Sequence, residues 1–270
     1  MNIQLLGTAA AEGWPGLFCN CSACSRAREL GGKNLRSRTA ALIDDTIKID
    51  LPPDTLHHVH LWKLDLSKLT HLFITHSHED HFAPNELLFL GPDFSKRKHL
   101  NPLRVYGNSD IMKAVMRLAG EGLDANFHEV KPFERIKAGP YDIHSILANH
   151  GRDEHPLNYI ISRHGKFVLY ACDTGMYADE TWQYLREFKL DLVIVECTGG
   201  PKAIDYKTHM GIPDVLEFKK KAEQIGLTGP KTQWILTHFS HFCGATHDEL
   251  VELGKPYGLQ IGYDGMSIEV

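Results

Sequence analysis

The sequence predicts an α/β protein in which helices cover a mixed β-sheet system. Short runs rich in apolar and β-branched residues recur along the whole chain, and patterns typical of helices fall between them. The early runs follow one another closely, as hairpins do, whereas the later runs alternate with helical segments. This order indicates a sheet that is partly antiparallel and partly parallel, with helices packed on it.

The predicted elements can be placed in chain order. The strands are expected at 3–6, 40–43, 46–49, 71–75, 103–106, 142–147, 158–162, 166–171, 192–196, 233–237 and 266–270, and the helices at about 22–30, 109–119, 178–188, 213–225 and 246–254. The polar connections between 43 and 47 and between 162 and 167 are typical of hairpin turns. Pro213 with Asp214 indicates a helix start, and Thr246 with Glu249 forms a capping-box pattern.

The composition is ordinary for a folded protein. The chain has 270 residues, of which 43% are hydrophobic and 23% charged, so it can bury a sizeable core. Because the sequence has no internal repeat or Pro/Ser-rich linker, we expect residues 1–270 to form a single domain. The formal charge of −5 argues against nucleic acid as a partner beyond small nucleotides. A small phosphate ester is compatible with this charge when a bound cation holds it.

The sequence also carries signals about location. The N-terminal segment lacks the basic region of a signal peptide, since its first positively charged side chain is Arg26. No stretch approaches the ~20 apolar residues that cross a membrane. The cluster of Cys19, Cys21 and Cys24 is more typical of a metal site in a reducing compartment than of disulfides. We therefore expect a cytoplasmic protein with no membrane partner, as a monomer or a homodimer.

Side chains that can bind metal ions follow several predicted strands. His76 follows "LFIT", His238 follows "WILT", and Asp173 comes shortly after "FVLY", while His150 and Glu196 close two further runs. Loops at strand ends are where a rigid sheet can aim side chains at one point. We expect these residues to converge on one site.

The stretch "THSHEDH" (75–81) crowds His76, His78, Asp80 and His81 together. Side chains at alternate positions of an extended backbone point to the same side, so His76 and His78 can share one cation. Asp80 and His81 can then turn towards a second cation. Imidazole and carboxylate ligands suit Zn, Mn or Fe, and two cations about 3.5–4 Å apart can clamp a phosphodiester and activate a water molecule.

This motif, with the order of the later strand-end residues, resembles the metallo-β-lactamase family over nearly the whole chain. "THSHEDH" is similar to that family's His-x-His-x-Asp-His signature. The resemblance implies a four-layer αβ/βα sandwich with its site at one edge, between two sheets. It also implies a first metal held by His76, His78 and His150, a second held by Asp80, His81 and His238, and a bridging Asp173.

The segment "CNCSACSRAR" (19–28) supplies three thiols at a spacing that suits a tetrahedral zinc ion. A fourth ligand is needed, and "THFSH" offers His241, with Cys243 as a rival. Together with "GYDGM" (262–266), these features resemble the cyclic phosphodiesterase family accessory to bacterial carbon–phosphorus lyase. That resemblance implies one structural zinc ion on Cys19, Cys21, Cys24 and His241, and two manganese (or zinc) ions in the active site.

The function implied by this resemblance is hydrolysis of a small cyclic phosphodiester, such as 5-phosphoribosyl 1,2-cyclic phosphate, by a water activated between two metals. His209, in "KTHMGIPD", lies where the family places a histidine that protonates the leaving group or contacts the phosphate. Asp80 is expected to serve catalysis as well as metal binding. Asp50, after "TIKI", is expected to orient a metal-bound imidazole from behind.

Several alternatives stay open. His144 and His155 are rivals to His150, Glu196 is interpreted as a supporting or helix-capping carboxylate, and "HHVHLW" (57–62) as a surface or lid segment. Other functions on this fold are a tRNA 3′-processing endonuclease, a thioester or lactam hydrolase, and a non-catalytic zinc protein similar to pyrroloquinoline-quinone biosynthesis protein B. The charge of −5 and the lack of a basic, Gly-rich insertion argue against the endonuclease, and the intact motif argues against the non-catalytic protein.

Overall fold

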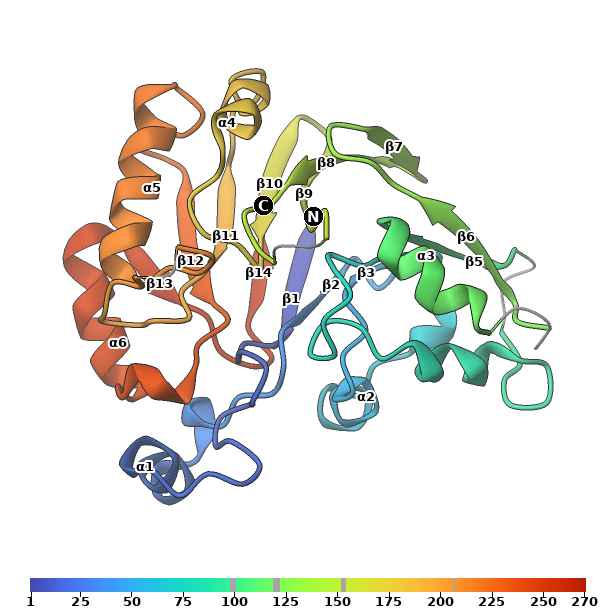
Figure 1. Ribbon diagram of the computed structural model, residues 1–270, viewed down its shortest axis with the longest axis horizontal. Coiled ribbons are helices and arrows are strands. Elements are labelled where there is room, and N and C mark those ends of the chain that lie inside the picture. The colour runs from blue at the N-terminus through green and yellow to red at the C-terminus, as the bar shows by residue number, and fades with distance from the viewer. Residues whose placement is uncertain (98–100, 119–121, 152–153, 206) are drawn as a thin grey trace.

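Two seven-stranded sheets pack face to face, with helices on the outer side of each (Figure 1). The structure is a computed structural model that describes residues 1–97, 101–118, 122–151, 154–205 and 207–270. Helices α4, α5 and α6 cover one sheet, and α2 and α3 cover the other (Figure 1). The predicted α/β class and four-layer αβ/βα sandwich are therefore confirmed.

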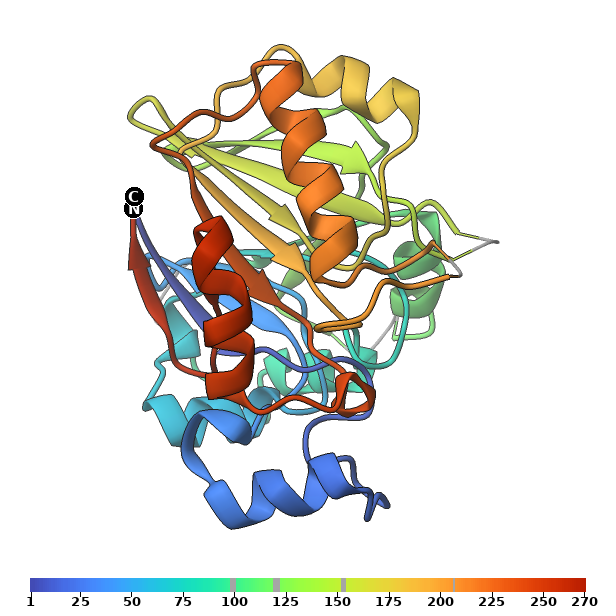
Figure 2. The same ribbon diagram turned by 90° about the vertical axis from the view of Figure 1, so that its left-hand side faces the viewer.

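The first sheet joins the two ends of the chain. Its strands, in spatial order, are β14 (Ser267–Glu269), β1 (Asn2–Gly7), β2 (Ala40–Ile43), β3 (Ile47–Ile49), β4 (His71–Phe73), β5 (Leu103–Gly107) and β6 (Ala125–Glu129). β1 and β14 are antiparallel, with Asn2 opposite Glu269, so the termini lie side by side (Figure 2). From β3 to β6 the strands are parallel, so their carboxyl ends lie at the same edge.

The second sheet is also mixed. Its order is β13 (Leu259–Ile261), β12 (Gln233–Thr237), β11 (Leu192–Glu196), β10 (Lys166–Ala171), β9 (Leu157–Arg163), β8 (Tyr141–Leu147) and β7 (Arg135–Ala138). β10 to β13 are parallel, whereas β7 to β10 pair antiparallel. The helices of the fold are α1 (Ser22–Leu30), α2 (Thr55–Trp62), α3 (Ser109–Met116), α4 (Asp179–Leu185), α5 (Ile212–Gln224) and α6 (His247–Gly254).

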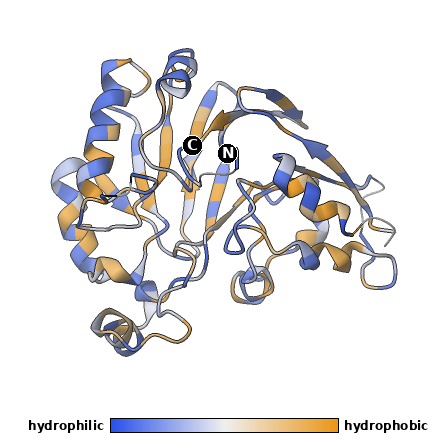
Figure 3. Ribbon diagram, in the orientation of Figure 1, coloured by the Kyte–Doolittle hydropathy of each residue, from blue (hydrophilic) through white to orange (hydrophobic). Residues whose placement is uncertain are grey.

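Three clusters of buried side chains fill the three interfaces between the four layers. Strand β11 shows why: Val193 and Val195 face the helices, while Leu192 and Ile194 face the other sheet. A strand covered on both faces is a nearly continuous apolar run, which is why "LVIVE" shows no polar alternation before its terminal Glu196. Figure 3 shows the resulting hydrophobic strands between helices of mixed character, and Figure 2 shows α5 and α6 lying across this sheet.

The local signals in the sequence are largely borne out. The β2–β3 hairpin turns through Asp44 and Asp45, both with positive φ, and the β9–β10 hairpin turns through His164 and Gly165. Thr246 and Glu249 form the expected capping box of α6. The helix predicted over 109–119 ends at Met116, and residue 119 lies outside the described residues.

The sequence patterns did not predict three of the strands, β6, β7 and β13. The edge strands β6 and β7 are short and half exposed, and β13 has only three residues, so none has a clear period-two pattern. The interpretation of 57–62 as a bland surface or lid segment is wrong in part, because these residues form most of α2. His58 in this helix is fully buried and is hydrogen-bonded through Nε2 to Ser37 Oγ at 2.7 Å. Pro52, Pro53 and Asp54, which directly precede α2, are typical of the start of a helix.

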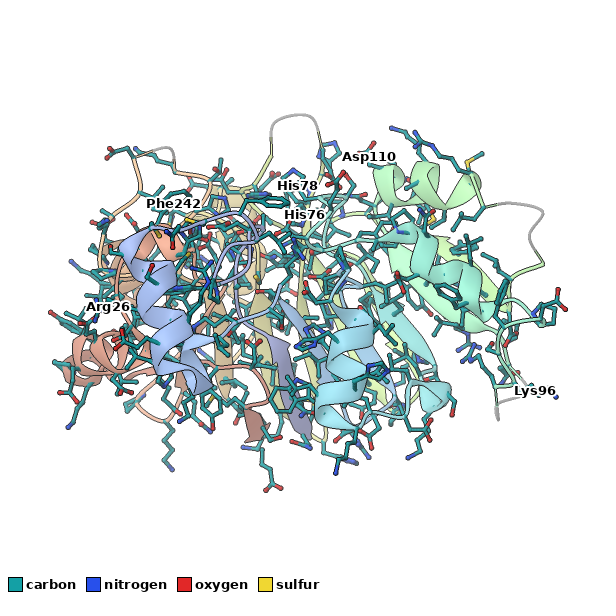
Figure 4. All side chains as sticks on the ribbon, turned by 90° about the horizontal axis from the view of Figure 1, so that it is seen from below. Arg26, His76, His78, Lys96, Asp110 and Phe242 are labelled. Atoms are coloured by element: carbon teal, nitrogen blue, oxygen red, sulfur yellow. The ribbon has the colours of Figure 1, made fainter. Side chains whose placement is uncertain are left out.

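The residues singled out in the sequence follow the carboxyl ends of strands from both sheets. β4 leads to His76, β8 to His150, β10 to Asp173 and β12 to His238. Figure 4 shows His76 and His78 at one edge of the sandwich, with Phe242 and Asp110 on either side of them. In the described part of the chain, no helix is long and apolar enough to cross a membrane.

Candidate metal centre

Three imidazoles form the first ligand group. Nε2 of His76 lies 2.9 Å from Nδ1 of His78, and Nε2 of His150 lies 3.1 Å from that same Nδ1. His76 and His150 are buried, whereas His78 is exposed. Three ring nitrogens that lie within 4.8 Å of one another could hold one metal ion between them.

A second ligand group adjoins the first. Oδ2 of Asp80 lies 3.2 Å from Nε2 of His81 and 3.6 Å from Nε2 of His238. All three side chains are buried. One carboxylate and two imidazoles make a donor set typical of a catalytic site for zinc or manganese.

Asp173 lies between the two groups. Its Oδ2 is 3.6 Å from Nε2 of His150 in the first group, and 3.4 Å from Nε2 of His238 and 4.0 Å from Nε2 of His81 in the second. A single carboxylate oxygen therefore faces both groups, which is the geometry of a bridging ligand in a two-metal site.

Four of these imidazoles, those of His76, His81, His150 and His238, are oriented by a partner on the nitrogen that faces away from the ligand groups. Nδ1 of His81 donates to Asp50 at 2.7 Å, and Nδ1 of His238 is hydrogen-bonded to Thr198 Oγ1 at 2.9 Å. Nδ1 of His76 contacts Thr75 Oγ1 at 3.1 Å, and Nδ1 of His150 donates to the carbonyl of Thr208 at 3.3 Å. Such contacts fix the ring and leave Nε2 as the nitrogen for the metal.

The residues present fit metal ions. Nε2 of His81 and Nε2 of His238 are fully buried, and neither makes a hydrogen bond of acceptable geometry among the described residues. A buried polar atom without a partner is costly, so two such atoms aimed at one carboxylate form a donor set that fits a cation. Burial disfavours the charged form of His81, but Asp80 and Asp50 outweigh it and raise the pKa of His81 well above its usual value. The negative charges of Asp80 and Asp50 therefore favour a positive charge at this position.

His209 and Glu196 lie beside the second group. Nδ1 of His209 is 2.8 Å from Oδ1 of Asp173 and 3.0 Å from Oε1 of Glu196. Burial favours the neutral ring, but these carboxylates outweigh it and raise the pKa of His209 to about 11. Glu196 also accepts hydrogen bonds from Thr198 N and Oγ1, both at 2.8 Å, and from Met210 N at 3.2 Å. Glu196 is therefore occupied in ordering the loop that carries His209.

A second cluster joins α1 to the segment after β12. The Sγ atoms of Cys19, Cys21 and Cys24 and a ring nitrogen of His241 all lie within 4.8 Å of one another. A hydrogen bond from the Cys24 backbone is the main cause that lowers the pKa of Cys21 to about 6, while burial raises the pKa of Cys24 to about 11. Three cysteines and one histidine form a closed tetrahedral set, which suits a structural zinc ion.

The structure distinguishes His241 from its rival Cys243. Nδ1 of His241 lies 3.4 Å from Sγ of Cys21 and 3.8 Å from Sγ of Cys19. Cys243 is buried elsewhere, with its thiol directed at the carbonyl of Ala245. Nε2 of His241 lies 3.7 Å from Oε1 of Glu12, which also accepts a hydrogen bond from Ser240.

The residues that the sequence singled out are thus brought together in two places. The metal centre gathers His76, His78, Asp80, His81, His150, Asp173, His209 and His238, and the thiol cluster gathers Cys19, Cys21, Cys24 and His241. Of the rivals to His150, His144 bonds Tyr184 of α4 at 2.9 Å, and His155 is exposed. Sequence reasoning missed Thr75 and Thr198, although Thr75 directly precedes His76 and Thr198 follows shortly after β11.

Solved structures share this fold across the whole chain. A diphosphatase from the PhnP family matches 100% of this chain and 96% of its own, at 20% identity and a TM-score of 0.75. Zn²⁺-bound PqqB from Methylobacterium extorquens covers 100% of both chains, at 14% identity and a TM-score of 0.75. The short form of human tRNase Z covers 100% of this chain and 99% of its own, at 19% identity and a TM-score of 0.68. At these identities the likeness shows the fold alone.

Sequence relatives point to the same family. Ribonuclease Z of Pyrococcus abyssi is 26% identical over 145 residues, which are 51% of this chain and 46% of the relative. Ribonuclease Z of Thermococcus kodakarensis is 30% identical over 132 residues, 46% of this chain and 40% of the relative. The chain spans less than half the length of these relatives. The sequence also matches the β-lactamase superfamily domain over residues 45–239, which are most of the chain. This range contains every residue of the metal centre and none of the thiol cluster. The chain therefore belongs to the β-lactamase superfamily. Its fold and its candidate His/Asp metal sites are those of a metal-dependent hydrolase.

Proposed function

We propose that this protein is a metal-dependent phosphodiesterase that hydrolyses a small cyclic phosphate ester, such as 5-phosphoribosyl 1,2-cyclic phosphate. One observation carries the proposal: the Oδ2 atom of Asp173 faces both ligand groups at 3.4–4.0 Å. Two cations held by these adjacent groups would neutralise the charge of one phosphodiester and activate a water molecule. We further propose two Mn²⁺ or Zn²⁺ ions here and one structural Zn²⁺ in the thiol cluster.

The chemistry that divalent ions supply in such a site is activation of water and neutralisation of phosphate charge. The protein's own part is to order the ligands and to supply a proton. Asp50 and Thr198 hold the His81 and His238 rings, so their Nε2 atoms face inwards. His209, fixed through Nδ1 by Asp173 and Glu196, is the group proposed to protonate the leaving alkoxide.

The relatives support a phosphorus ester as the substrate class. Ribonuclease Z is an enzyme that acts on RNA, and the structural relative from the PhnP family is a diphosphatase. The formal charge of −5 favours a small substrate over a polyanion, because extended phosphate backbones are held by basic surfaces.

A second candidate is RNA processing of the ribonuclease Z type, and it rests on one observation. The curated relatives that match this chain are ribonucleases Z from archaea, at 26–30% identity. The match covers only 40–46% of those proteins, so the parts of them that grip RNA need have no equivalent here. Precursor tRNA therefore belongs among the substrates tested.

The first experiment is metal analysis by inductively coupled plasma mass spectrometry, on protein purified without chelator and then supplied with manganese. We expect about three metal ions per chain, one of them zinc that resists mild chelation. The same preparation is then assayed on a 1,2-cyclic ribosyl phosphate, a 2′,3′-cyclic nucleotide, a diphosphate-linked nucleotide, precursor tRNA and a β-lactam.

Fastest turnover of a cyclic phosphate supports the proposal, and fastest cleavage of precursor tRNA supports the second candidate. Fastest turnover of the β-lactam would contradict both. A single tight zinc ion with no hydrolysis would also contradict the phosphodiesterase and favour a non-catalytic protein similar to PqqB.

A further inference from the structure

The carboxylate of Glu154 joins two of the segments that carry ligands of the first group. Its Oε1 accepts a hydrogen bond of 2.8 Å from the backbone N–H of Ser77, and its Oε2 accepts one of 2.8 Å from the Ser77 hydroxyl. Ser77 stands between His76 and His78, while Glu154 follows His150 in the loop between β8 and β9. Both carboxylate oxygens of Glu154 are therefore hydrogen-bonded to the loop that follows β4.

A third segment completes this contact. Nδ2 of Asn108 donates to Glu154 Oε1 at 2.7 Å and to the carbonyl of His155 at 2.9 Å. Asn108 is buried, and its own Oδ1 caps α3 by accepting from Asp110 N and Ile111 N, both at 3.1 Å. The side chain of Asn108 is thus held from the helix side and presents a fixed donor to Glu154.

The backbone around Glu154 is also tied at its base. Ala148 N donates to Pro156 O at 2.9 Å, and Leu157 N donates to Thr75 O at 2.8 Å. The loop that contains His150 is therefore closed on itself next to the "THSHEDH" segment. These backbone bonds fix the base of the loop, and Glu154 fixes its position relative to His76 and His78.

We propose that Glu154 is a positioning residue for the first metal ion, because it sets the spacing between His150 and the His76–His78 pair. The three donors on Glu154 are uncharged N–H and O–H groups, so the contribution of Glu154 is geometric. Partners of this kind behind the ligands are typically worth about 10–100-fold in metal affinity. The inference rests on the candidate metal centre and is independent of the substrate.

The chain offers variants that separate geometry from charge. In Glu154→Gln the amide oxygen can still accept from Ser77 N and Asn108, and the amide N–H can donate to the Ser77 hydroxyl oxygen, so the contact survives without its charge. Glu154→Ala removes the contact entirely. Asp191→Ala is the matched control, because Asp191 also ties two segments, accepting from Phe167 N at 3.0 Å, far from the ligand groups.

The test is calorimetric titration with Mn²⁺ in an Asp80→Ala background, in which the second group lacks its carboxylate. We expect Glu154→Ala to weaken Mn²⁺ binding about 10–100-fold, and Glu154→Gln to weaken it less than about threefold. Asp191→Ala should lower the melting temperature without changing Mn²⁺ affinity. In the otherwise unaltered chain, excess Mn²⁺ should restore occupancy to Glu154→Ala.

Unchanged Mn²⁺ affinity in Glu154→Ala would overturn the proposal. So would an equal loss of affinity in Asp191→Ala, since a general loss of stability would then explain both variants. Because the readout is metal binding, a negative substrate screen would leave this result intact.

Discussion

Asp50 accepts a hydrogen bond of 2.7 Å from Nδ1 of His81, and both side chains are completely buried. Asp50 is itself held by the backbone N–H of Thr75 at 2.8 Å and by the Thr75 hydroxyl at 2.9 Å. This contact keeps the proton of His81 on Nδ1, so Nε2 keeps its lone pair for a metal ion. The Asp50 backbone has a φ of 62°, a left-handed conformation that Asp and Asn tolerate better than most residues.

Asp50→Asn should therefore disturb the metal centre without a backbone penalty. An amide N–H in place of Oδ2 would face the N–H of His81, so the ring would have to move its proton to Nε2 and could no longer bind metal there. We expect the affinity of the second metal to fall about 10–100-fold. Competition with a fluorescent chelator measures this. Asp45→Asn, in the hairpin turn with a φ of 58°, should leave metal binding unchanged.

Asp80→Ala should abolish hydrolysis of bis(p-nitrophenyl) phosphate and remove about one metal ion per chain, since Asp80 supplies the carboxylate of the second group. Circular dichroism should show a folded protein, because Asp80 stands in a loop at the edge of the sandwich. Glu79→Ala is the control, as the exposed Glu79 lies next to Asp80 in the chain. Equal loss in both variants would argue against a specific role for Asp80.

His209→Asn should slow the cleavage of substrates according to their leaving group. For a cyclic phosphate with an alkoxide leaving group, we expect kcat to fall about 10²–10⁴-fold. For bis(p-nitrophenyl) phosphate the loss should be much smaller, because p-nitrophenolate leaves without a proton. Metal content should be unchanged. Equal losses on both substrates would mean that His209 acts by holding Asp173 or phosphate, not as an acid.

Cys21→Ser should remove the tightly held zinc ion, whereas Cys243→Ser should retain it. The reason is that His241, and not Cys243, lies with Cys19, Cys21 and Cys24. His241→Ala should also lose zinc. The measurement is the zinc content per chain after mild chelation, determined by mass spectrometry. Zinc retained in Cys21→Ser together with zinc lost in Cys243→Ser would contradict this assignment.

Acid should destabilise the fold through His58. Burial is the main cause that lowers the pKa of His58 to about 3. Below about pH 6.5 the unfolded chain protonates this ring while the folded protein does not, so the free energy of unfolding falls as pH decreases from about 6.5 to 3. The slope from one such histidine is at most about 1.4 kcal/mol per pH unit, and above pH 6.5 there is no contribution.

His58→Gln should flatten this dependence, as urea unfolding at a series of pH values would measure. His60→Gln is the control on the same helix, because His60 is exposed. If the wild type and His58→Gln have parallel pH profiles, His58 is not the group that takes up the proton.

The sequence by itself predicted most strands, the hairpin turns, the helix caps and the strand-end residues, because these depend on local periodicity and turn chemistry. The apolar run "LVIVE" predicted a strand buried on both faces, and the polar "DDT" predicted a hairpin turn. The alternation within "THSHEDH" already indicated that His76 and His78 share a direction. The resemblance to the metallo-β-lactamase family then supplied the four-layer architecture.

Only the tertiary structure decided which distant segments meet. It brought His241 among the thiols instead of Cys243, turned His144 towards α4, made a helix of 55–62, and set Glu154 against Ser77. None of these relationships has a local signal, because each depends on the order of strands within two sheets and on the angle at which the sheets face each other. Sequence periodicity says which side chains leave a strand on the same side, but the packing of the layers sets the distances between them.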